Sequence, residues 1–247
     1  MKIYGLIGHP LSHSWSAQYF SEKFMKESRF DESYQLFPLQ SIREFPLLIR
    51  SNPLLCGLNV TIPFKETVMT YLDRIDTTAK KIRAVNTIII QRNHGQINTI
   101  GYNTDAPGFI QSLPQGFNHK NALILGHGGA AKAIAYALEK LGISFLFISR
   151  NSSCNLTKSY QDVNDTMIQK HTLIINTTPL GMYPHKGEAP PLPYHLLTPR
   201  HFLYDLIYNP EESLFLQHGK AMGATLKNGL EMLKNQADLS DLIFQHI

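Results

Sequence analysis

The sequence NALILGHGGAAKAIAYALEKLG, residues 121–142, joins an apolar strand, a glycine-rich turn and a helix. Gly126, Gly128 and Ala131 form a G-x-G-x-x-A pattern, in which backbone N–H groups and the helix dipole can hold a pyrophosphate. Without Cβ atoms at the two glycines, the chain can turn tightly and approach a phosphate. Gly142 can end the helix, whose apolar face is predicted to carry Ile134, Ala137, Leu138 and Leu141. We predict a dinucleotide-binding unit here, with a merely structural turn as the alternative.

A second strand, SFLFIS, follows this helix and leads directly into Arg150. At this point NAD sites usually place an Asp or Glu on the ribose 2′-OH, whereas the 2′-phosphate of NADP favours Arg. No carboxylate lies beside Arg150, so we predict NADP as the cofactor; the alternative is that Arg150 is only a surface charge. The polar loop RNSSCN, a helix near residues 156–169 and the strand TLIIN are predicted to continue the unit.

Strands and helices also alternate near the N-terminus, which is typical of α/β domains with parallel strands. The predicted order is strand, helix, strand, short helix and strand, carried by KIYGLIG, SAQYFSEKFMKES, YQLFPL, IREFPLLIRS and CGLNVTI. Pro46 is expected to interrupt the short helix. The strands NTIII and QINTIGYN then flank QRNHG, whose Asn, His and Gly favour a hairpin turn.

Residues 59–65, NVTIPFK, place a lysine directly after a strand-like run. In an extended chain, Asn59 and Thr61 would point to one face, and Val60 and Ile62 to the other, which is expected to be core. The polar face could therefore line a site that includes the lysine. A half-buried edge strand with an exposed lysine would give the same pattern, and only other parts of the chain can distinguish the two interpretations.

Length and composition are those of a globular protein. The chain has 247 residues, of which 43% are hydrophobic and 17% charged, and this argues against disorder. The length allows one large or two ordinary domains. The formal charge of +4 comes from scattered Lys and Arg, which favours small anionic ligands over nucleic acid.

The cysteines and the N-terminus indicate the compartment. Cys56 and Cys154 form no CxxC pair and have no His or Cys at metal-ligand spacing, so neither a disulfide framework nor a metal site is predicted. The apolar run in MKIYGLIGHP is too short for a signal peptide, and no run approaches the roughly 20 apolar residues of a membrane span. We expect a soluble cytoplasmic protein.

Eight motifs occur in the order and approximate spacing found in the shikimate dehydrogenases, namely GHPLSHSWS, GLNVTIPFK, AVNT, GYNTDAPGF, GHGGAAKA, INTTPLGM, YDLIYNP and NGLEMLKNQA. Taken singly, their Ser, Asn and Asp residues could be helix caps or turn residues. Together they resemble this family over nearly the full length of the chain. The resemblance implies two α/β domains with a cleft between them: a substrate domain of residues 1–104 and 228–247, completed by the C-terminal helix, and a Rossmann-like NADP domain of residues 105–227. It also implies reversible NADPH-dependent reduction of 3-dehydroshikimate to shikimate, in the pathway to chorismate and the aromatic amino acids, by a monomer or homodimer.

The resemblance also implies the site residues. A Lys65 ammonium beside the carbonyl can act as general acid, and the Asp105 carboxylate can hold it in place. Ser14 and Ser16 would bind the substrate carboxylate. The other implied substrate-binding residues are Asn59, Thr61, Lys65, Asn86, Asp105, Tyr208 and Gln236. The implied cofactor-binding residues are Gly126, His127, Gly128, Gly129, Ala130, Ser149, Arg150, Asn151, Thr177 and Gly229.

Three positions depart from the family pattern, and these departures put the strength of the preference for NADP over NAD in question. Ser149 stands where Asn is common, Lys132 where Arg is usual, and His127 lies at the variable position of the turn. Residues 150–175 also look compact, as if one element were trimmed. Two alternatives to a shikimate dehydrogenase stay open: a related enzyme that uses quinate or both acids, and a non-catalytic binding or regulatory protein that retains the dinucleotide domain.

Overall fold

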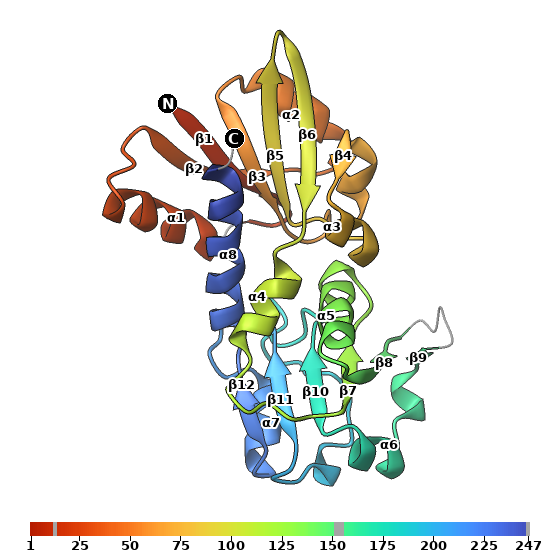
Figure 1. Cartoon of the computed structure of the whole chain (residues 1–247). Coiled ribbons are helices and arrows are strands. Elements are labelled where there is room, and N and C mark those ends of the chain that lie inside the picture. The colour runs from red at the N-terminus through yellow and green to blue at the C-terminus, as the bar shows by residue number, and fades with distance from the viewer. Residues whose placement is uncertain (12–13, 151–155, 246–247) are drawn as a thin grey trace. The chain divides into compact units, whose positions relative to one another are not determined.

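The computed structural model describes residues 1–11, 14–150 and 156–245, and the chain divides into two compact units (Figure 1). The first unit comprises Met1–Thr104 and Gln236–Ile247, and the second unit comprises Asp105–Asn235. The predicted α/β fold, with an N-terminal domain completed by C-terminal residues, is confirmed. Residues 228–235, which the sequence analysis assigned to the first domain, fall in the second unit.

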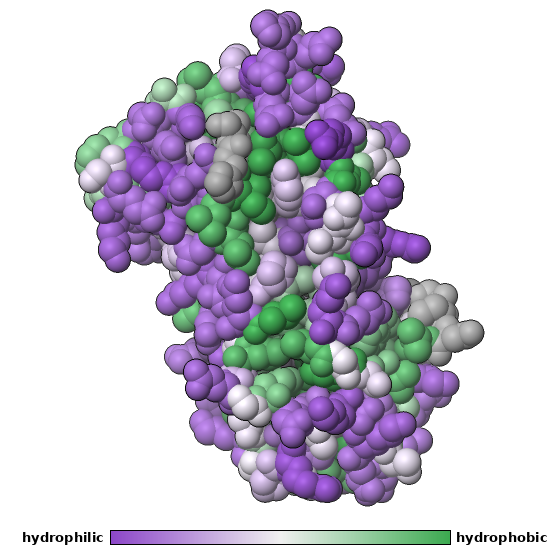
Figure 2. Space-filling view, in the orientation of Figure 1, coloured by the Kyte–Doolittle hydropathy of each residue, from purple (hydrophilic) through white to green (hydrophobic). Residues whose placement is uncertain are grey.

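The first unit is built on a six-stranded mixed sheet of order β2-β1-β3-β5-β6-β4. Its strands are β1 Lys2–Gly8, β2 Glu32–Pro38, β3 Leu55–Val60, β4 Arg74–Ile75, β5 Thr87–Asn93 and β6 Gln96–Tyr102. β1 pairs in parallel with β2 and β3, whereas β5 is antiparallel to β3 and β6. The predicted hairpin is confirmed, because His94 and Gly95 join β5 to β6 with φ values of 51° and 80°. Polar residues cover its tip, at the top of Figure 2.

Helices of the first unit are α1 Trp15–Lys26, α2 Phe45–Ser51 and α3 Thr77–Ile82, joined by most of α8 Leu230–Gln245. Pro46 does not interrupt a helix, contrary to the prediction. It lies in the first turn of α2, where backbone N–H groups make no intrahelical hydrogen bond, so a proline without an N–H is tolerated. A separate 3-10 helix, Ile42–Glu44, precedes α2. Helix α3 was not predicted; Asp76 caps it by accepting a hydrogen bond from Thr78 N at 2.7 Å.

β3 lies in the middle of the sheet, so the edge-strand interpretation of residues 59–65 is wrong. One hydrophobic cluster holds Leu58 and Val60 of β3, and a second cluster includes Tyr4 of β1 and Phe244 of α8, whose rings stack at 4.8 Å. A Cβ atom at Gly57 would come within 2.5 Å of the Phe244 ring. The close approach of α8 to this strand therefore requires a glycine at position 57.

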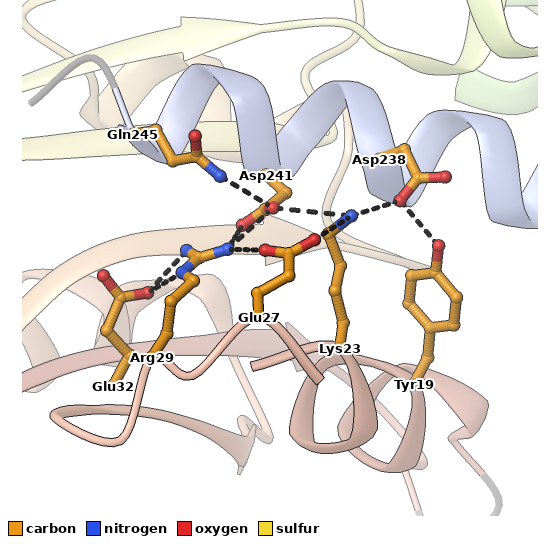
Figure 3. A network of polar contacts seen from close by, with 8 residues as sticks. All are labelled: Tyr19, Lys23, Glu27, Arg29, Glu32, Asp238, Asp241 and Gln245. Carbon is orange, nitrogen blue, oxygen red and sulfur yellow. Dashed lines mark hydrogen bonds and ion pairs between the residues drawn. The ribbon is translucent and has the colours of Figure 1, made fainter. Parts of the chain in front are cut away.

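Ionic contacts tie α8 to α1 and to the loop that follows it (Figure 3). The Arg29 guanidinium donates to both carboxylate oxygens of Asp241, at 2.9 and 2.8 Å, and Asp238 accepts from Lys23 at 2.9 Å and from Tyr19 at 2.6 Å. Burial would lower the pKa of Arg29, but its hydrogen bonds with Asp241, Glu27 and Glu32 raise it above the usual value. Asp241 is buried, so loss of the arginine would leave its carboxylate with Lys23, at 3.7 Å, as its one cationic partner among the described residues.

The second unit contains a six-stranded sheet of order β12-β11-β10-β7-β8-β9, and every strand pair among its described residues is parallel. The strands are β7 Asn121–Leu125, β8 Ser144–Ile148, β9 Thr157–Lys158, β10 Leu173–Asn176, β11 Phe202–Asp205 and β12 Thr225–Lys227. Its helices are α4 Asp105–Ser112, α5 Gly129–Lys140, α6 Asp165–Lys170 and α7 Leu214–Ala221. This arrangement confirms the predicted Rossmann-like domain.

Two local predictions for the second unit need correction. The helix expected near residues 156–169 is largely replaced by β9, a 3-10 helix and the short α6, which Asn164 caps by accepting from Met167 N at 3.0 Å. Leu141 is 41% exposed because α5 ends before it, where Ile143 N donates to Leu138 O at 2.9 Å and Gly142 adopts a φ of 68°. Most of the predicted loop RNSSCN lies outside the described residues.

A search of the described residues finds no helix with the length and apolarity needed to cross a membrane. The same part of the chain contains no group of three or more His, Cys, Asp or Glu side chains that could hold a metal ion.

Candidate active site

The chain leaves the first-unit sheet immediately after Val60, and this brings Thr61 and Lys65 into a turn. Thr61 N still donates to Ile7 O at 2.9 Å, and Thr61 O then accepts from Phe64 N at 3.0 Å. The predicted strand alternation fails here, because Ile62 is 52% exposed instead of facing the core. Lys65 is half-buried, and its carbonyl accepts from Val85 N at 2.8 Å. The turn is therefore fixed beside the segment that leads to Asn86.

Asn86 and Gln236 are brought together from segments far apart in the sequence. Asn86 Oδ1 accepts from the backbone N–H of Thr104 at 2.7 Å, so its amide nitrogen points the other way. That Nδ2 atom donates to Gln236 Oε1 at 3.2 Å. Because a backbone N–H can only donate, Thr104 fixes the orientation of the Asn86 amide, and Gln236 Oε1 is thereby used as an acceptor.

Asn59 lies in the same first-unit cluster of amides and hydroxyls, almost entirely buried. Its Nδ2 atom donates to Ser240 Oγ at 2.9 Å and lies 3.2 Å from Asn86 O, while its Oδ1 atom accepts from the Tyr34 hydroxyl at 2.8 Å. Other members that the sequence analysis did not identify are Thr87, Thr104 and Ser240, whose hydroxyls lie 2.8–3.4 Å from one another. Neutral donors and acceptors of this kind suit a ligand with several hydroxyl groups.

Ser14 and Ser16 lie at the start of α1. Ser14 is the N-cap, and its hydroxyl accepts from Ser16 N at 3.3 Å. Burial raises the pKa of Tyr34 well above its usual value, against an opposing hydrogen bond with the Ser16 side chain. The N-terminus of a twelve-residue helix carries a partial positive charge, which favours an anion such as a carboxylate.

The glycine turn of the second unit presents backbone rather than side chains. Gly126 has a φ of 109°, and a Cβ atom there would lie 2.6 Å from Thr177 Oγ1, which itself donates to Leu125 O at 2.6 Å. Gly128 is the N-cap of α5 and makes no side-chain cap, and a Cβ atom there would meet nothing among the described residues within 4 Å. The N–H groups of Gly129 and Ala130 begin the helix and have no intrahelical partner. The turn therefore fits a pyrophosphate.

Arg150 follows β8, at the same edge of the sheet as the glycine turn, since Gly126 N donates to Ile148 O at 2.8 Å. Burial raises the pKa of Tyr160 to about 12, and the nearby charge of Arg150 opposes this rise. Ser149 N donates to Lys158 O at 3.0 Å, so β9 holds the residue before the arginine. His127 packs against Phe147, with ring centroids 4.8 Å apart. Asn151 lies outside the described residues.

The remaining predicted site residues all belong to the second unit. Asp105 is the first residue of α4 and is buried, and Tyr208 is half-buried after β11. A Cβ atom at Gly229 would lie 2.1 Å from Leu206 O, so the backbone there passes directly over the segment before Tyr208. Lys65, by contrast, belongs to the first unit.

Asp205, which the sequence analysis did not single out, fixes the segment before Tyr208. Its carboxylate accepts from Asn176 Nδ2 and Ile207 N, each at 3.0 Å, and from the Ser213 hydroxyl. Burial raises the pKa of Asp205 to about 6, although these hydrogen bonds act in the opposite direction. The available signal was an acidic residue directly after the apolar run FLY, residues 202–204, in the YDLIYNP motif.

Comparison with known proteins gives consistent matches. Residues 6–88 match the shikimate dehydrogenase substrate binding domain. The chain is 38% identical to the shikimate dehydrogenase (NADP(+)) of Carboxydothermus hydrogenoformans, covering 97% of this chain and 90% of the relative, and 39% identical to that of Clostridium beijerinckii, covering 99% and 92%. A crystal structure of shikimate 5-dehydrogenase from Thermus thermophilus, in complex with NADP(H) and shikimate, superposes with a TM-score of 0.85 at 29% identity, covering 100% of this chain and 94% of that one.

Proposed function

The chain belongs to the shikimate dehydrogenase family, and we propose that it catalyses the reversible NADPH-dependent reduction of 3-dehydroshikimate to shikimate. It is an NADP-dependent oxidoreductase that acts on a CH–OH group, in the pathway to chorismate and the aromatic amino acids. The observation that carries this function is the match of 97% of the chain, through both units, to an enzyme of that name. The hydroxyl-rich cluster of the first unit and the glycine turn of the second unit agree with it.

We assign substrate binding to the first unit with the C-terminal helix, and NADP binding to the second unit. Ser14 and Ser16, at the N-terminus of α1, suit the substrate carboxylate. The ring hydroxyls are assigned to the amide and hydroxyl partners Asn59, Thr61, Asn86 and Gln236, with Tyr208 as a further contact. The pyrophosphate is assigned to residues 126–130, supported by Thr177, and the 2′-phosphate to Arg150 with Ser149 and Asn151. Gly229 is assigned to the nicotinamide, where a side chain would obstruct close approach.

The proposed chemistry places a proton on the oxygen that the reduction leaves negative. NADPH, when bound, supplies the hydride to the substrate ketone. The Lys65 ammonium donates the proton to the resulting oxygen, and in the reverse direction the neutral amine accepts the hydroxyl proton. Asp105 is proposed as the second catalytic residue, a carboxylate that can hold the lysine ammonium in place. The neutral hydrogen-bonding partners hold the ring so that the reacting carbon faces the cofactor.

We further propose a cytoplasmic enzyme that acts as a monomer or homodimer on small molecules alone. The absence of clustered Lys and Arg in the sequence supports a small-molecule role over nucleic-acid binding.

An absorbance assay of NADP⁺ reduction tests the function directly. The purified protein should form NADPH when shikimate is present and should not do so without it. Parallel assays with quinate separate a shikimate dehydrogenase from an enzyme that uses quinate or both acids. Absence of turnover with either acid would favour the non-catalytic binding protein and would overturn the proposal.

A further inference from the structure

Tyr34 of β2 carries a buried hydroxyl that is bonded to Asn59, a residue assigned to the substrate. Its ring stacks on Phe20 of α1, with centroids 4.3 Å apart and an interplanar angle of 3°. Its hydroxyl donates to Asn59 Oδ1 at 2.8 Å. The position of the oxygen is therefore set by the strand and by aromatic packing, independently of any ligand.

The Asn59 amide has only one orientation that satisfies its partners. Its Nδ2 atom faces the carbonyl oxygen of Asn86, which can only accept, so Oδ1 must face Tyr34. Among the described residues, the Tyr34 hydroxyl is the one donor to Asn59 Oδ1. Removal of that hydroxyl would leave a buried amide oxygen without its donor and would weaken the preference for this orientation.

Tyr34 thereby links the aromatic packing between α1 and β2 to an amide assigned to the ring hydroxyls.

We propose that Tyr34 is a positioning residue for the reaction, which orients the Asn59 amide for substrate binding without touching the substrate. This role rests on the proposed function, because it presumes that Asn59 binds shikimate. It concerns ground-state binding of the acid, and neither proton transfer by Lys65 nor binding of NADP depends on it.

Tyr4 provides a matched control. It is the direct Cα partner of Tyr34 across the parallel pair β1–β2, it belongs to the same hydrophobic cluster, and it is fully buried. Its hydroxyl, however, has no hydrogen-bond partner among the described residues. Tyr4→Phe and Tyr34→Phe therefore remove the same atom from neighbouring positions, and only Tyr34→Phe removes a hydrogen bond to the assigned site.

Steady-state kinetics of wild type, Tyr34→Phe and Tyr4→Phe test the proposal. We expect Tyr34→Phe to raise the KM for shikimate by about 3- to 15-fold, the range for loss of one neutral hydrogen bond. Its kcat should change less than about threefold, and its KM for NADP⁺ should match wild type. Tyr4→Phe should match wild type in all three constants.

Two results would overturn the positioning role. One is an unchanged shikimate KM in Tyr34→Phe; the other is an equal change in all three constants together with a lower Tm, which indicates a general structural role. Loss of turnover in wild type itself would instead overturn the proposed function, and this role with it. The wild-type rate therefore separates the two failures.

Discussion

The two units present their candidate ligand-binding groups in opposite ways. In the first unit the groups are side-chain amides and hydroxyls, from residues as distant as Asn59 and Gln236, and hydrogen bonds link them through Asn86. In the second unit the groups are backbone N–H groups of one short turn, whose placement depends on the lack of a side chain at Gly126, while Gly128 leaves open space for a ligand. Loss of one side chain should therefore disturb the cluster in the first unit, whereas an added side chain should disturb the glycine turn in the second unit.

Lys65 is the group whose loss should have the largest effect. Lys65→Ala should lower kcat by roughly 10²- to 10⁴-fold and change the shikimate KM only a few fold, because the amide and hydroxyl partners remain. Asp105→Asn should show the same pattern, and the double variant should be less than additive. Steady-state kinetics with exposed Lys80→Ala as control provides the measurement. A raised KM with normal kcat would make Lys65 a substrate anchor, and a normal enzyme would remove its role.

The glycine turn offers a pair of substitutions that separates folding from ligand approach. Gly128 has a negative φ and open space around it, so Gly128→Ala should leave Tm within a few degrees and raise the NADP⁺ KM by about 10- to 100-fold. Gly126→Ala meets Thr177 and requires a positive φ, so it should lower Tm as well. Thermal melts and NADP⁺ titrations measure both effects. Unchanged NADP⁺ affinity in Gly128→Ala would contradict a backbone site.

Arg150 is the one charged side chain assigned to the cofactor. Cofactor binding by the second unit is therefore expected to depend on this side chain as well as on the backbone of the glycine turn. We expect wild type to use NADP⁺ with at least about tenfold higher kcat/KM than NAD⁺, about 1.4 kcal/mol. Arg150→Ala should lower kcat/KM for NADP⁺ and leave kcat/KM for NAD⁺ nearly unchanged. Exposed Arg200→Ala is the matched control. Equal efficiency of wild type with both cofactors would exclude the role of Arg150.

Asp205 gives the smallest predicted effect, on the stability of the second unit. Its folded-state pKa of about 6 exceeds the roughly 3.9 of an unfolded Asp, so the folded state keeps a proton that the unfolded state releases. That stabilisation is complete below about pH 4 and is lost as the pH rises through 6. Asp205→Asn cannot titrate, so its Tm relative to wild type should rise by about 5 °C between pH 4.5 and 7. A constant Tm difference would place the pKa of Asp205 outside this range.

The sequence predicted the second unit more directly than the first. A strand, a glycine turn and a helix are contiguous, so local spacing identifies Gly126, Gly128 and Ala131 without knowledge of the fold. The exposure of Leu141 escaped prediction because the end of a helix depends on a few backbone hydrogen bonds, which hydrophobic periodicity does not report.

The cluster in the first unit could be predicted only through family resemblance, and only in part. Strand alternation misplaced Ile62, because β3 ends at Val60 and is buried on both sides. Tyr34, Thr104 and Ser240 were missed because their proximity arises from tertiary packing. Ser240 alone had a local signal, since it lies one helical turn after Gln236 and therefore on the same face of α8.

The attachment of α8 has a consequence for protein synthesis. Residues 236–245 supply Phe244 to the first-unit core, Asp241 to Arg29 and Ser240 to Asn59, yet the ribosome makes them after the entire second unit. At about 5–20 residues per second, the nascent first unit waits on the order of 10 s with an uncovered aromatic face and without the Asp241 partner of Arg29. During that interval the second unit can fold, whereas the first cannot complete its core. An apolar surface of the growing chain therefore stays exposed until α8 has been made.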